Sequence, residues 1–198
     1  MINILVSYKY DEQLPDSDDE ITEEESISSV LKETVILLVT AIALAWFIYT
    51  FVLQTFWIPS GSMEPTIQPG DRVLVAKFYY RFFEPKPGDV VVFPTPKKLR
   101  NGEPDLIKRI IATEDMEVVE KKGKMFIDGK EISEPYVRPD SNNANYGPFI
   151  VPRDKLFVMG DNRANSKDSR FIGPIDDGKV IGKAFFTYWP PNRFGVLK

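Results

Sequence analysis

One serine lies in a turn that could carry chemistry. Ser62 belongs to PSGSMEPT, residues 59–66, which follows a long apolar run. A serine hydroxyl becomes a useful nucleophile only when a neighbouring base takes its proton. The 198-residue chain has no histidine and no cysteine. The available bases are therefore carboxylates, lysines and the amino terminus, and a serine–lysine pair is an established variant of the catalytic triad.

A lysine serves as a base only where burial keeps its amine neutral, since its ordinary pKa is about 10.4. Two lysines lie in short apolar stretches with alternating pattern. Lys77 ends RVLVAK, and Lys108 lies inside DLIKRII, where apolar residues bracket it on both sides. The pattern slightly favours Lys108. For both lysines the alternative is a stem that covers apolar surface while the amine stays in water.

A third segment, GDNRANSKDSRFIG (160–173), is dense in hydrogen-bond donors and acceptors. It is either a surface loop held by turns of Asx type or part of a site. Its charged residues could also form an ordinary ion-pair network of Asp161, Arg163, Asp168 and Arg170. The sequence alone does not place this segment near Ser62.

The elements that must position these residues begin with an acidic segment, residues 1–34. It carries ten acidic and two basic residues, so we expect a disordered or loosely helical tail. Residues 35–57 have no charge across 23 positions. At about 1.5 Å per residue they are long enough to cross a hydrocarbon core of about 30 Å. The acidic flank and the bulky aromatic exit favour a retained transmembrane helix over a cleaved signal peptide or a buried core helix.

Residues 58–198 are predicted to form an all-β domain, antiparallel and barrel-like or sandwich-like. Short apolar or alternating stretches are separated by turn signals such as PGD and DG. In KKGKMFIDGKEI the pair Asp128-Gly129 predicts a hairpin turn. The expected strands lie in 72–78, 89–94, 105–111, 116–129, 155–160 and 179–189.

Composition limits the function classes. The absence of cysteine excludes disulfides and cysteine-ligated zinc, and the absence of histidine makes a transition-metal site a poor prospect. The net charge of −4 combines the acidic tail with a mildly basic body, which has no concentrated basic face for nucleic acid.

Four stretches resemble the motif boxes of type I signal peptidases, which are membrane-anchored serine–lysine endopeptidases, and they occur in the family's order. The apolar segment ahead of them is similar too, so the resemblance runs from residue 35 to the C-terminus. The resemblance is specific because the first and last stretches occur together, in order, after an apolar segment. The third stretch alone would not be specific. The four are PSGSMEPT (59–66), GDRVLVAK (70–77), IKRII (107–111) and GDNRANSKDSR (160–170).

The resemblance implies a role for each matching residue. Ser62 would be the nucleophile and Lys108 the general base. Ser166 would orient the lysine amine, and Ser60 would complete an oxyanion hole with the Ser62 backbone N–H. Structural support would come from Asp161, Asp168 and Arg170. Shallow pockets for small substrate side chains would be lined by Ile58, Met63, Ile67 and Ile107.

The resemblance also implies partners and a location. The substrates would be signal peptides of exported pre-proteins, cleaved after small residues, with no metal, cofactor or nucleic acid. The protein would cross the inner or plasma membrane once and contact lipid, with its β domain on the export side. A thylakoid membrane is the alternative if the source is a plastid or a cyanobacterium.

The chain departs from the family after Lys108. Where the family usually continues toward a Pro-Gly-Asp turn, this chain reads IIATEDM (110–116), and any second β subdomain must be small. Three other interpretations stay open: a self-cleaving repressor-type serine–lysine protease, a single-pass adaptor whose β domain only binds partners, and an inactive homologue. The repressor type should carry a DNA-binding domain, and none is visible.

Overall fold

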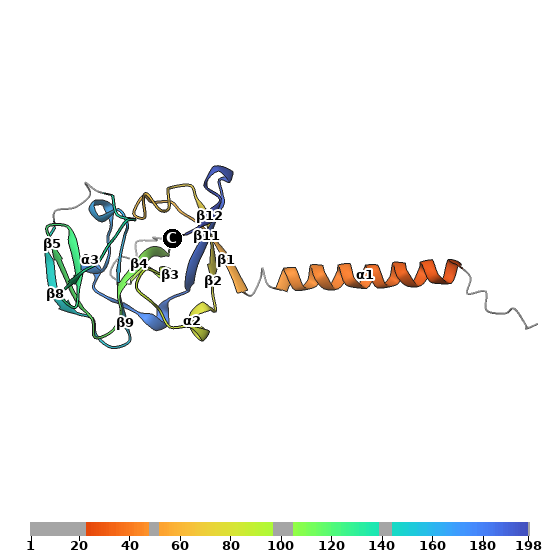
Figure 1. Ribbon diagram of the computed structural model, residues 1–198, viewed down its shortest axis with the longest axis horizontal. Helices are drawn as coiled ribbons and strands as arrows, with labels where there is room; N and C mark the ends of the chain where they lie inside the picture. The colour runs from red at the N-terminus through yellow and green to blue at the C-terminus, as the bar shows by residue number, and fades with distance from the viewer. Residues whose placement is uncertain (1–22, 48–51, 97–104, 139–143, 198) are drawn as a thin grey trace, which may run out of the picture. The chain divides into compact units, whose positions relative to one another are not determined.

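The structure is a computed structural model that describes residues 23–47, 52–96, 105–138 and 144–197 (Figure 1). It divides into two units, Met1–Ala45 and Trp46–Lys198. Each unit is described by itself.

The first unit holds all but the last two residues of one long helix, α1, which runs from Glu23 to Phe47. Its segment Ser28–Phe47 is 20 residues long with a mean hydropathy of 2.0 and no buried residue. At about 1.5 Å per residue this segment spans about 30 Å. The hydroxyl groups of Thr34 and Thr40 donate to the carbonyl oxygens of Val30 and Ile36. The two threonine hydroxyls inside this segment are therefore satisfied within the helix.

The predicted helix over 35–57 is wrong at both ends. The helix starts earlier, at Glu23, inside the segment predicted as an acidic tail. The residues Leu53–Trp57 form a strand, β1, which pairs with β2 (Arg72–Ala76). A long run without charge does not by itself distinguish a short strand from a helix. Pairing with β2 and the packing of Phe56 against the core favour the strand here.

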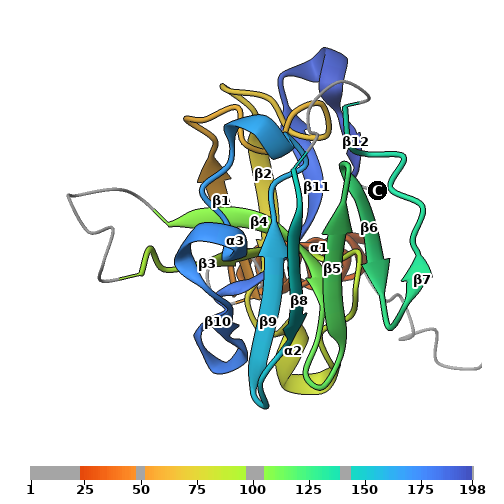
Figure 2. The ribbon, with the colours of Figure 1, turned by 90° about the vertical axis from the view of Figure 1, so that its left-hand side faces the viewer.

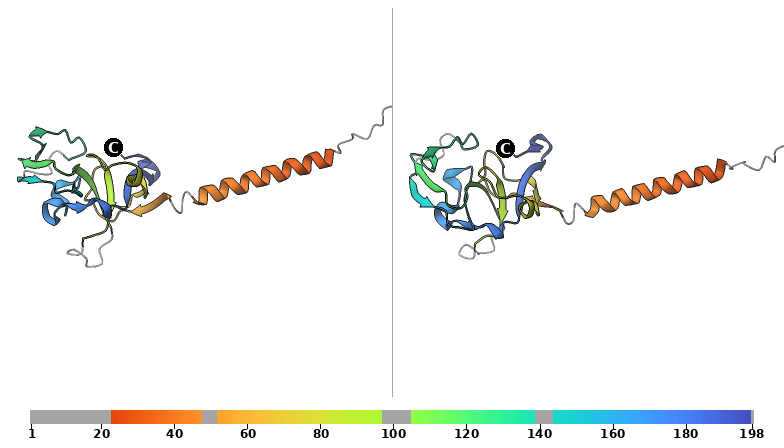
Figure 3. Two further views of the ribbon diagram at one scale, coloured as in Figure 1. Left: turned by 90° about the horizontal axis from the view of Figure 1, so that it is seen from below. Right: turned by 60° about the horizontal axis from the view of Figure 1, so that its bottom comes forward.

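The second unit is built from two antiparallel sheets (Figures 2 and 3). The larger sheet is curled and has the order β1-β2-β11-β3-β4-β9-β10, with β12 beside β11; the smaller has the order β7-β6-β5-β8. The remaining strands are β3 Val90–Phe93, β4 Leu106–Ala112, β5 Glu117–Lys121, β6 Lys124–Ile127, β7 Lys130–Glu131, β8 Tyr146–Ile150, β9 Lys155–Met159, β10 Ile175–Asp176, β11 Gly182–Trp189 and β12 Gly195–Val196. The short helices are α2 Tyr79–Phe82, α3 Ser169–Ile172 and the 3₁₀ turns η3 Arg163–Asn165, η4 Asp177–Lys179 and η5 Pro191–Arg193.

The prediction of a mainly β fold is confirmed, and every predicted stretch contains a strand. The predicted hairpin is β6–β7, with Ile127 opposite Lys130 across Asp128-Gly129. Asp128 and Gly129 both have positive φ, as a two-residue hairpin turn of this type requires. Sequence reasoning missed β8, β10 and β12, since two of them are only two residues long and β8 contains Gly147 and Pro148.

The departure from the family after Lys108 is a turn built without proline or glycine. β4 runs to Ala112, and the amide of Met116 then donates to the Thr113 carbonyl at 3.3 Å. Asp115 supplies the positive φ, +63°, that a glycine often supplies. Its amide donates to Val151 at 2.8 Å. The IIATEDM sequence therefore forms an ordered connection into the smaller sheet.

An apolar cluster lies under the loop that carries Ser62. Met63, Ile67, Val73 and Val75 are fully buried there, with side chains from β3, β4 and β11 around them. Burying a side chain of this kind contributes roughly 1.5–3 kcal/mol. The loop is closed at its neck by backbone hydrogen bonds between Ile58 and Asp71, at 3.0 Å, and between Gly70 and Ile58, at 2.8 Å. The backbone around Ser62 is thus held by the apolar cluster and by the hydrogen bonds where the loop begins and ends.

Candidate active site

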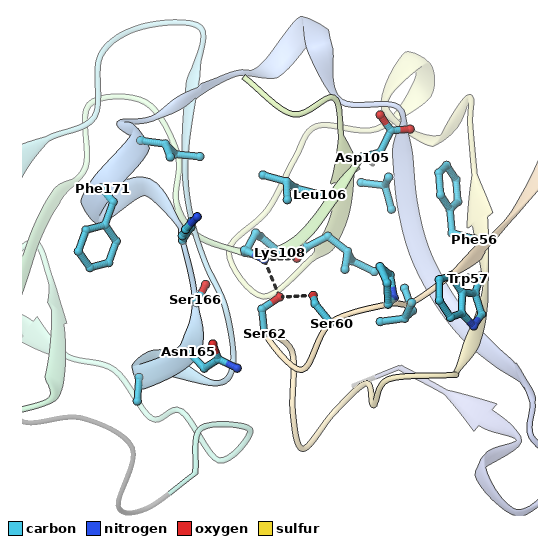
Figure 4. Close-up of a pocket in the computed structure, with 17 residues that line it drawn as sticks. Phe56, Trp57, Ser60, Ser62, Asp105, Leu106, Lys108, Asn165, Ser166 and Phe171 are labelled. Atoms are coloured by element: carbon cyan, nitrogen blue, oxygen red, sulfur yellow. Dashed lines mark hydrogen bonds between the residues drawn. The ribbon is translucent and has the colours of Figure 1, made fainter. Parts of the chain in front are cut away.

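Two segments far apart in sequence bring a hydroxyl and an amine together (Figure 4). Ser62 lies in the loop after β1, and Lys108 lies in β4. Lys108 Nζ donates to Ser62 Oγ at 2.7 Å and to the carbonyl oxygen of Ile107 at 2.9 Å. Lys108 is 2% exposed and Ser62 is 7% exposed. The pair predicted from sequence therefore lies within hydrogen-bond distance and is shielded from bulk water.

The environment of Lys108 favours its neutral form. Strand alternation places Leu106 and Ile110 on the same face of β4 as Lys108, and Val91 of β3 lies opposite Lys108 on that face. Burial lowers the pKa of Lys108 from 10.5 to about 8, although the negative charges of Asp168 and Asp161 act to raise it. The amine is therefore partly neutral near pH 8.

Lys77, the other candidate, does not have this environment. It follows the end of β2, is half-buried, and does not line the cleft that holds Ser62. Of the two candidate lysines, only Lys108 lines the cleft with Ser62.

Ser62 and Lys108 lie in a cleft of about 840 Å³. Figure 4 shows the pair between two ends of this cleft, with Phe56 and Trp57 at one end and Phe171 at the other. The first wall comes from β1 and from the start of β4, residues 105–108. The second comes from the loop 164–167 and from α3. Ser62 thus lies between the two ends of the cleft, with lining residues on both sides of it.

Ser60 lies beside the nucleophile position. Its Oγ is 3.4 Å from Ser62 Oγ, and both residues line the cleft. A hydroxyl that is near the serine and free to rotate can donate to an oxygen that carries developing charge. The position of Ser60 is consistent with the expected role.

Ser166 lies in the cleft but does not hold the lysine amine. Its Oγ is buried and has no hydrogen-bond partner among the described residues, and the acceptors of Lys108 are Ser62 and Ile107. A Cβ at Gly160 would lie 2.4 Å from Ser166 Oγ and 2.4 Å from the Ser62 carbonyl oxygen. Gly160 is therefore the residue that lets the 160–166 loop approach Ser62.

The four predicted pocket residues separate into two layers. Ile58 and Ile107 line the cleft. Met63 and Ile67 are fully buried in the apolar cluster and do not line it. Ile107 pairs with Val92 across β3 and β4, and Val92 also lines the cleft.

Two buried ion pairs hold the 160–170 loop. Asp161 accepts from Arg109 Nε at 2.9 Å and from Arg109 Nη2 at 2.7 Å, and both side chains are almost fully buried. Asp168 accepts from Arg170 Nε at 2.9 Å and Arg170 Nη2 at 3.0 Å. Asp168 also accepts from the amide of Gly160 at 3.2 Å. The predicted supporting residues thus fix the loop that faces Ser62, without touching its hydroxyl.

Sequence reasoning missed Arg109 and Asn162. Arg109 follows Lys108 in β4, so its side chain points to the opposite face, where it also donates to the Gly88 carbonyl at 2.8 Å. A signal was present, because an arginine inside an apolar strand needs a buried acceptor. Asn162 binds the backbone of the Ser62 loop. It lies in the 160–173 segment that is dense in donors and acceptors, but nothing in that composition distinguished it from its neighbours.

Within the described residues, no cluster of three or more histidine, cysteine, aspartate or glutamate side chains is placed to hold a metal ion. The chemistry that the cleft can support is proton transfer from the Ser62 hydroxyl to a neutral amine and attack by the resulting oxygen on a carbonyl. The arrangement is that of a hydrolase site in which lysine stands where many serine hydrolases use histidine.

The comparisons with known proteins agree with this class. A family model described as signal peptidase, peptidase S26, matches residues 31–189. A probable signal peptidase I-2 of Synechocystis is 43% identical over 81% of this chain and 74% of its own length. Signal peptidase I of Leptolyngbya laminosa is 39% identical over 79% of each chain. Signal peptidase IB of Staphylococcus aureus is 32% identical over 83% of this chain and 92% of its own. The chain belongs to the signal peptidase family, peptidase S26.

Proposed function

We propose that this protein is a membrane-bound serine endopeptidase that removes N-terminal signal peptides from exported pre-proteins. Ser62 is the nucleophile in this proposal and Lys108 is the general base. The observation that carries it is the 2.7 Å contact between Lys108 Nζ and Ser62 Oγ, made by an amine whose pKa burial lowers to about 8. Family membership supplies the substrate class.

The substrate would enter the cleft as an extended strand. β1 pairs only with β2 among the described strands, so its other edge is open. β9 pairs with β4 only from Arg109 onward, so residues 106–108 of β4 have no neighbouring strand on that side among the described residues. Both segments line the cleft. A peptide can therefore add as a strand between them, with its scissile carbonyl beside Ser62.

The reaction follows from the positions of the donors. Neutral Lys108 accepts the Ser62 proton, and Ser62 Oγ attacks the carbonyl carbon. The oxyanion accepts hydrogen bonds from the Ser62 N–H and the Ser60 hydroxyl. The lysinium then protonates the leaving amine, and the acyl-enzyme forms. In the second half Lys108 takes a proton from water, and the resulting hydroxide attacks the ester carbonyl. The lysinium then returns the proton to Ser62 Oγ as the ester bond breaks, which restores the free enzyme.

The preference for small residues before the scissile bond follows from the limited space in the cleft. Ile58, Ile107 and Val92 stand in the wall of the cleft, with Met63 and Ile67 packed behind them. This apolar wall is backed by a close-packed core. A large substrate side chain would have to displace the core residues, and such overpacking costs about 1–3 kcal/mol. Small residues are therefore favoured at the positions that face this wall.

The membrane anchor in this proposal is α1. Its length and hydropathy suit a single span, and the threonine hydroxyls within it are satisfied by the helix itself. We place the β unit on the export side of the inner or plasma membrane, or of a thylakoid membrane if the source is a plastid or a cyanobacterium. The acidic N-terminal segment then stays in the cytoplasm or stroma.

Lipid contact by the second unit is supported by an exposed aromatic row. Trp57 and Trp189 both pair with Arg72, so all three side chains lie on one face of the sheet. The tryptophans are 64% and 50% exposed, and Phe194 and Val196 nearby on the chain are each 68% exposed. Tryptophan beside a basic residue is typical of side chains that lie at a membrane interface. We propose that this face contacts lipid headgroups.

The test is cleavage of a synthetic signal-peptide substrate by the full chain in detergent or lipid. We expect Ser62→Ala and Lys108→Ala each to abolish cleavage, since one removes the nucleophile and the other the base. Circular dichroism and thermal unfolding should show that both variants stay folded. Substantial turnover by the Lys108→Ala variant would remove Lys108 as the base. An acylating probe that fails to label Ser62 in the parent protein would favour an adaptor or an inactive homologue instead.

A further inference from the structure

Asn162 holds the backbone of the Ser62 loop at two successive peptide groups. Its backbone N–H donates to the Ser62 carbonyl oxygen at 3.1 Å. Its side-chain Nδ2 donates to the Gly61 carbonyl oxygen, also at 3.1 Å. Asn162 is 8% exposed, so both contacts are shielded from water. The Gly61 carbonyl accepts one further hydrogen bond, from the Glu64 amide at 3.2 Å.

The Gly61 carbonyl and the Ser62 N–H belong to the same peptide group. That group is planar, and the cis bonds of the described residues lie elsewhere, so its C=O and N–H point in opposite directions. A donor that holds the Gly61 oxygen therefore also fixes the direction of the Ser62 N–H. The Ser62 N–H donates to no acceptor within the described residues, which leaves it free for a ligand.

We propose that the Asn162 carboxamide is a positioning residue that aims the Ser62 N–H at the substrate oxyanion by holding the other end of the same peptide group. This inference rests on the proposed function. It predicts that Asn162 acts on the transition state and leaves ground-state binding unaffected, because the oxyanion exists only after attack.

The direct test is Asn162→Ala in the full chain. This variant removes the side-chain donor and keeps the backbone hydrogen bond to Ser62. We expect kcat to fall about 10- to 100-fold with KM nearly unchanged, which is less than the loss of an oxyanion donor outright. The midpoint of the pH profile should stay where it is in the parent, because Lys108 is untouched.

Two inhibitors separate this role from a structural one. A peptide aldehyde forms a hemiacetal with Ser62 and places an oxygen in the oxyanion position, whereas the matching peptide alcohol has no carbonyl. Asn162→Ala should weaken the aldehyde by a factor similar to the loss in kcat and leave the affinity of the alcohol unchanged. Equal weakening of both inhibitors, an unchanged aldehyde affinity, or a shifted pH midpoint would overturn the proposal.

Further variants keep the test decisive. Asn162→Gln retains a carboxamide and should recover part of the activity. Asn162→Leu fills the space without a donor. If Asn162→Ala does not fold, Asn162→Leu takes its place, and the same losses are expected of it. Asn192→Ala, which removes an exposed carboxamide in η5, is the matched control and should match the parent. An inactive parent would refute the proposed function, whereas an active parent with a fully active Asn162→Ala would refute only this inference.

Discussion

At the scale of single residues, the burial of one amine determines the pH range of the site. Lys108 contacts Ser62 and is flanked by apolar side chains on its own face of β4. A protonated amine cannot accept the Ser62 proton. The rate should therefore follow the neutral fraction of Lys108.

We expect kcat/KM to rise with pH and to reach half its maximum near pH 8, the pKa to which burial lowers Lys108. Well below this value the increase should be about tenfold per pH unit, and above it the rate should level off. The measurement is kcat/KM from pH 6 to 10 on a peptide without titrating groups in that range. Lys77→Ala should show the same profile, and a flat profile would exclude a titrating amine as the base.

The same burial should make Lys108 costly for stability. Its pKa is near 8 when folded and 10.5 in the reference state, so below pH 8 the folded chain carries the full penalty of a buried charge. The penalty shrinks as pH rises from 8 to 10.5, where the unfolded lysine also loses its proton. Lys108→Met should abolish activity and raise the free energy of unfolding at pH 7 by about 3 kcal/mol.

Urea unfolding at pH 7 and at pH 10 measures this effect. The gain from Lys108→Met should be clearly smaller at pH 10. A gain of equal size at both values would mean that the methionine packs better and that charge plays no part.

At the scale of elements, β4 and the 160–170 loop organise the site together. β4 directs Lys108 to the cleft and Arg109 to the opposite face, where Arg109 binds Asp161. Thr66, from the Ser62 loop, also donates to Asp161, at 2.5 Å. One carboxylate thus connects β4, the Ser62 loop and the 160–170 loop.

Asp161→Asn should destabilise the protein by roughly 3–5 kcal/mol, because it leaves the buried Arg109 guanidinium without its counter-charge. Activity should fall as well, since the loop that faces Ser62 loses its main attachment. Thermal unfolding and cleavage rate are the two readouts. Asp176→Asn, which breaks the surface pairs with Lys155 and Lys179, is the control and should leave both near the parent values.

The sequence predicted the strands that carry the site because their apolar alternation is strong, as in β2, β3, β4 and β9. It did not predict where α1 ends, because residues 35–57 carry no charge and the strand Leu53–Trp57 continues that uncharged run. The motif resemblance selected Ser62 and Lys108, and the structure brings them together. The Asn162 contacts could not be predicted, because they depend on two loops distant in sequence coming together, where the side-chain and backbone N–H groups of Asn162 meet the carbonyl oxygens of Gly61 and Ser62.

At the scale of the whole molecule, the chain joins an apolar helix to a unit with its own core. The second unit, Trp46–Lys198, contains all twelve strands of the described chain and every buried residue of the cleft. Its folding should therefore not depend on α1. Tethering raises the concentration of a membrane-bound substrate near the site without adding any contact to it.

A chain that starts at Val52 should therefore cleave a short soluble peptide about as well as the full chain. On a precursor embedded in lipid vesicles it should be at least about tenfold slower, because the effective concentration from tethering is lost. The comparison is kcat/KM for both substrates with both proteins. A truncated chain that is equally slow on both substrates would show that α1 supports the fold of the site.

The open edge of β1 has one more consequence. The five residues of this strand carry no charge, and charged side chains are a common means by which proteins prevent edge strands from joining each other. An edge kept free for a substrate is equally free for the same edge of a second molecule. Pro59, two residues after the end of the strand, limits how far such pairing could extend. An accessible site therefore carries a risk of self-association through β1. A peptide bound along this edge should suppress that self-association.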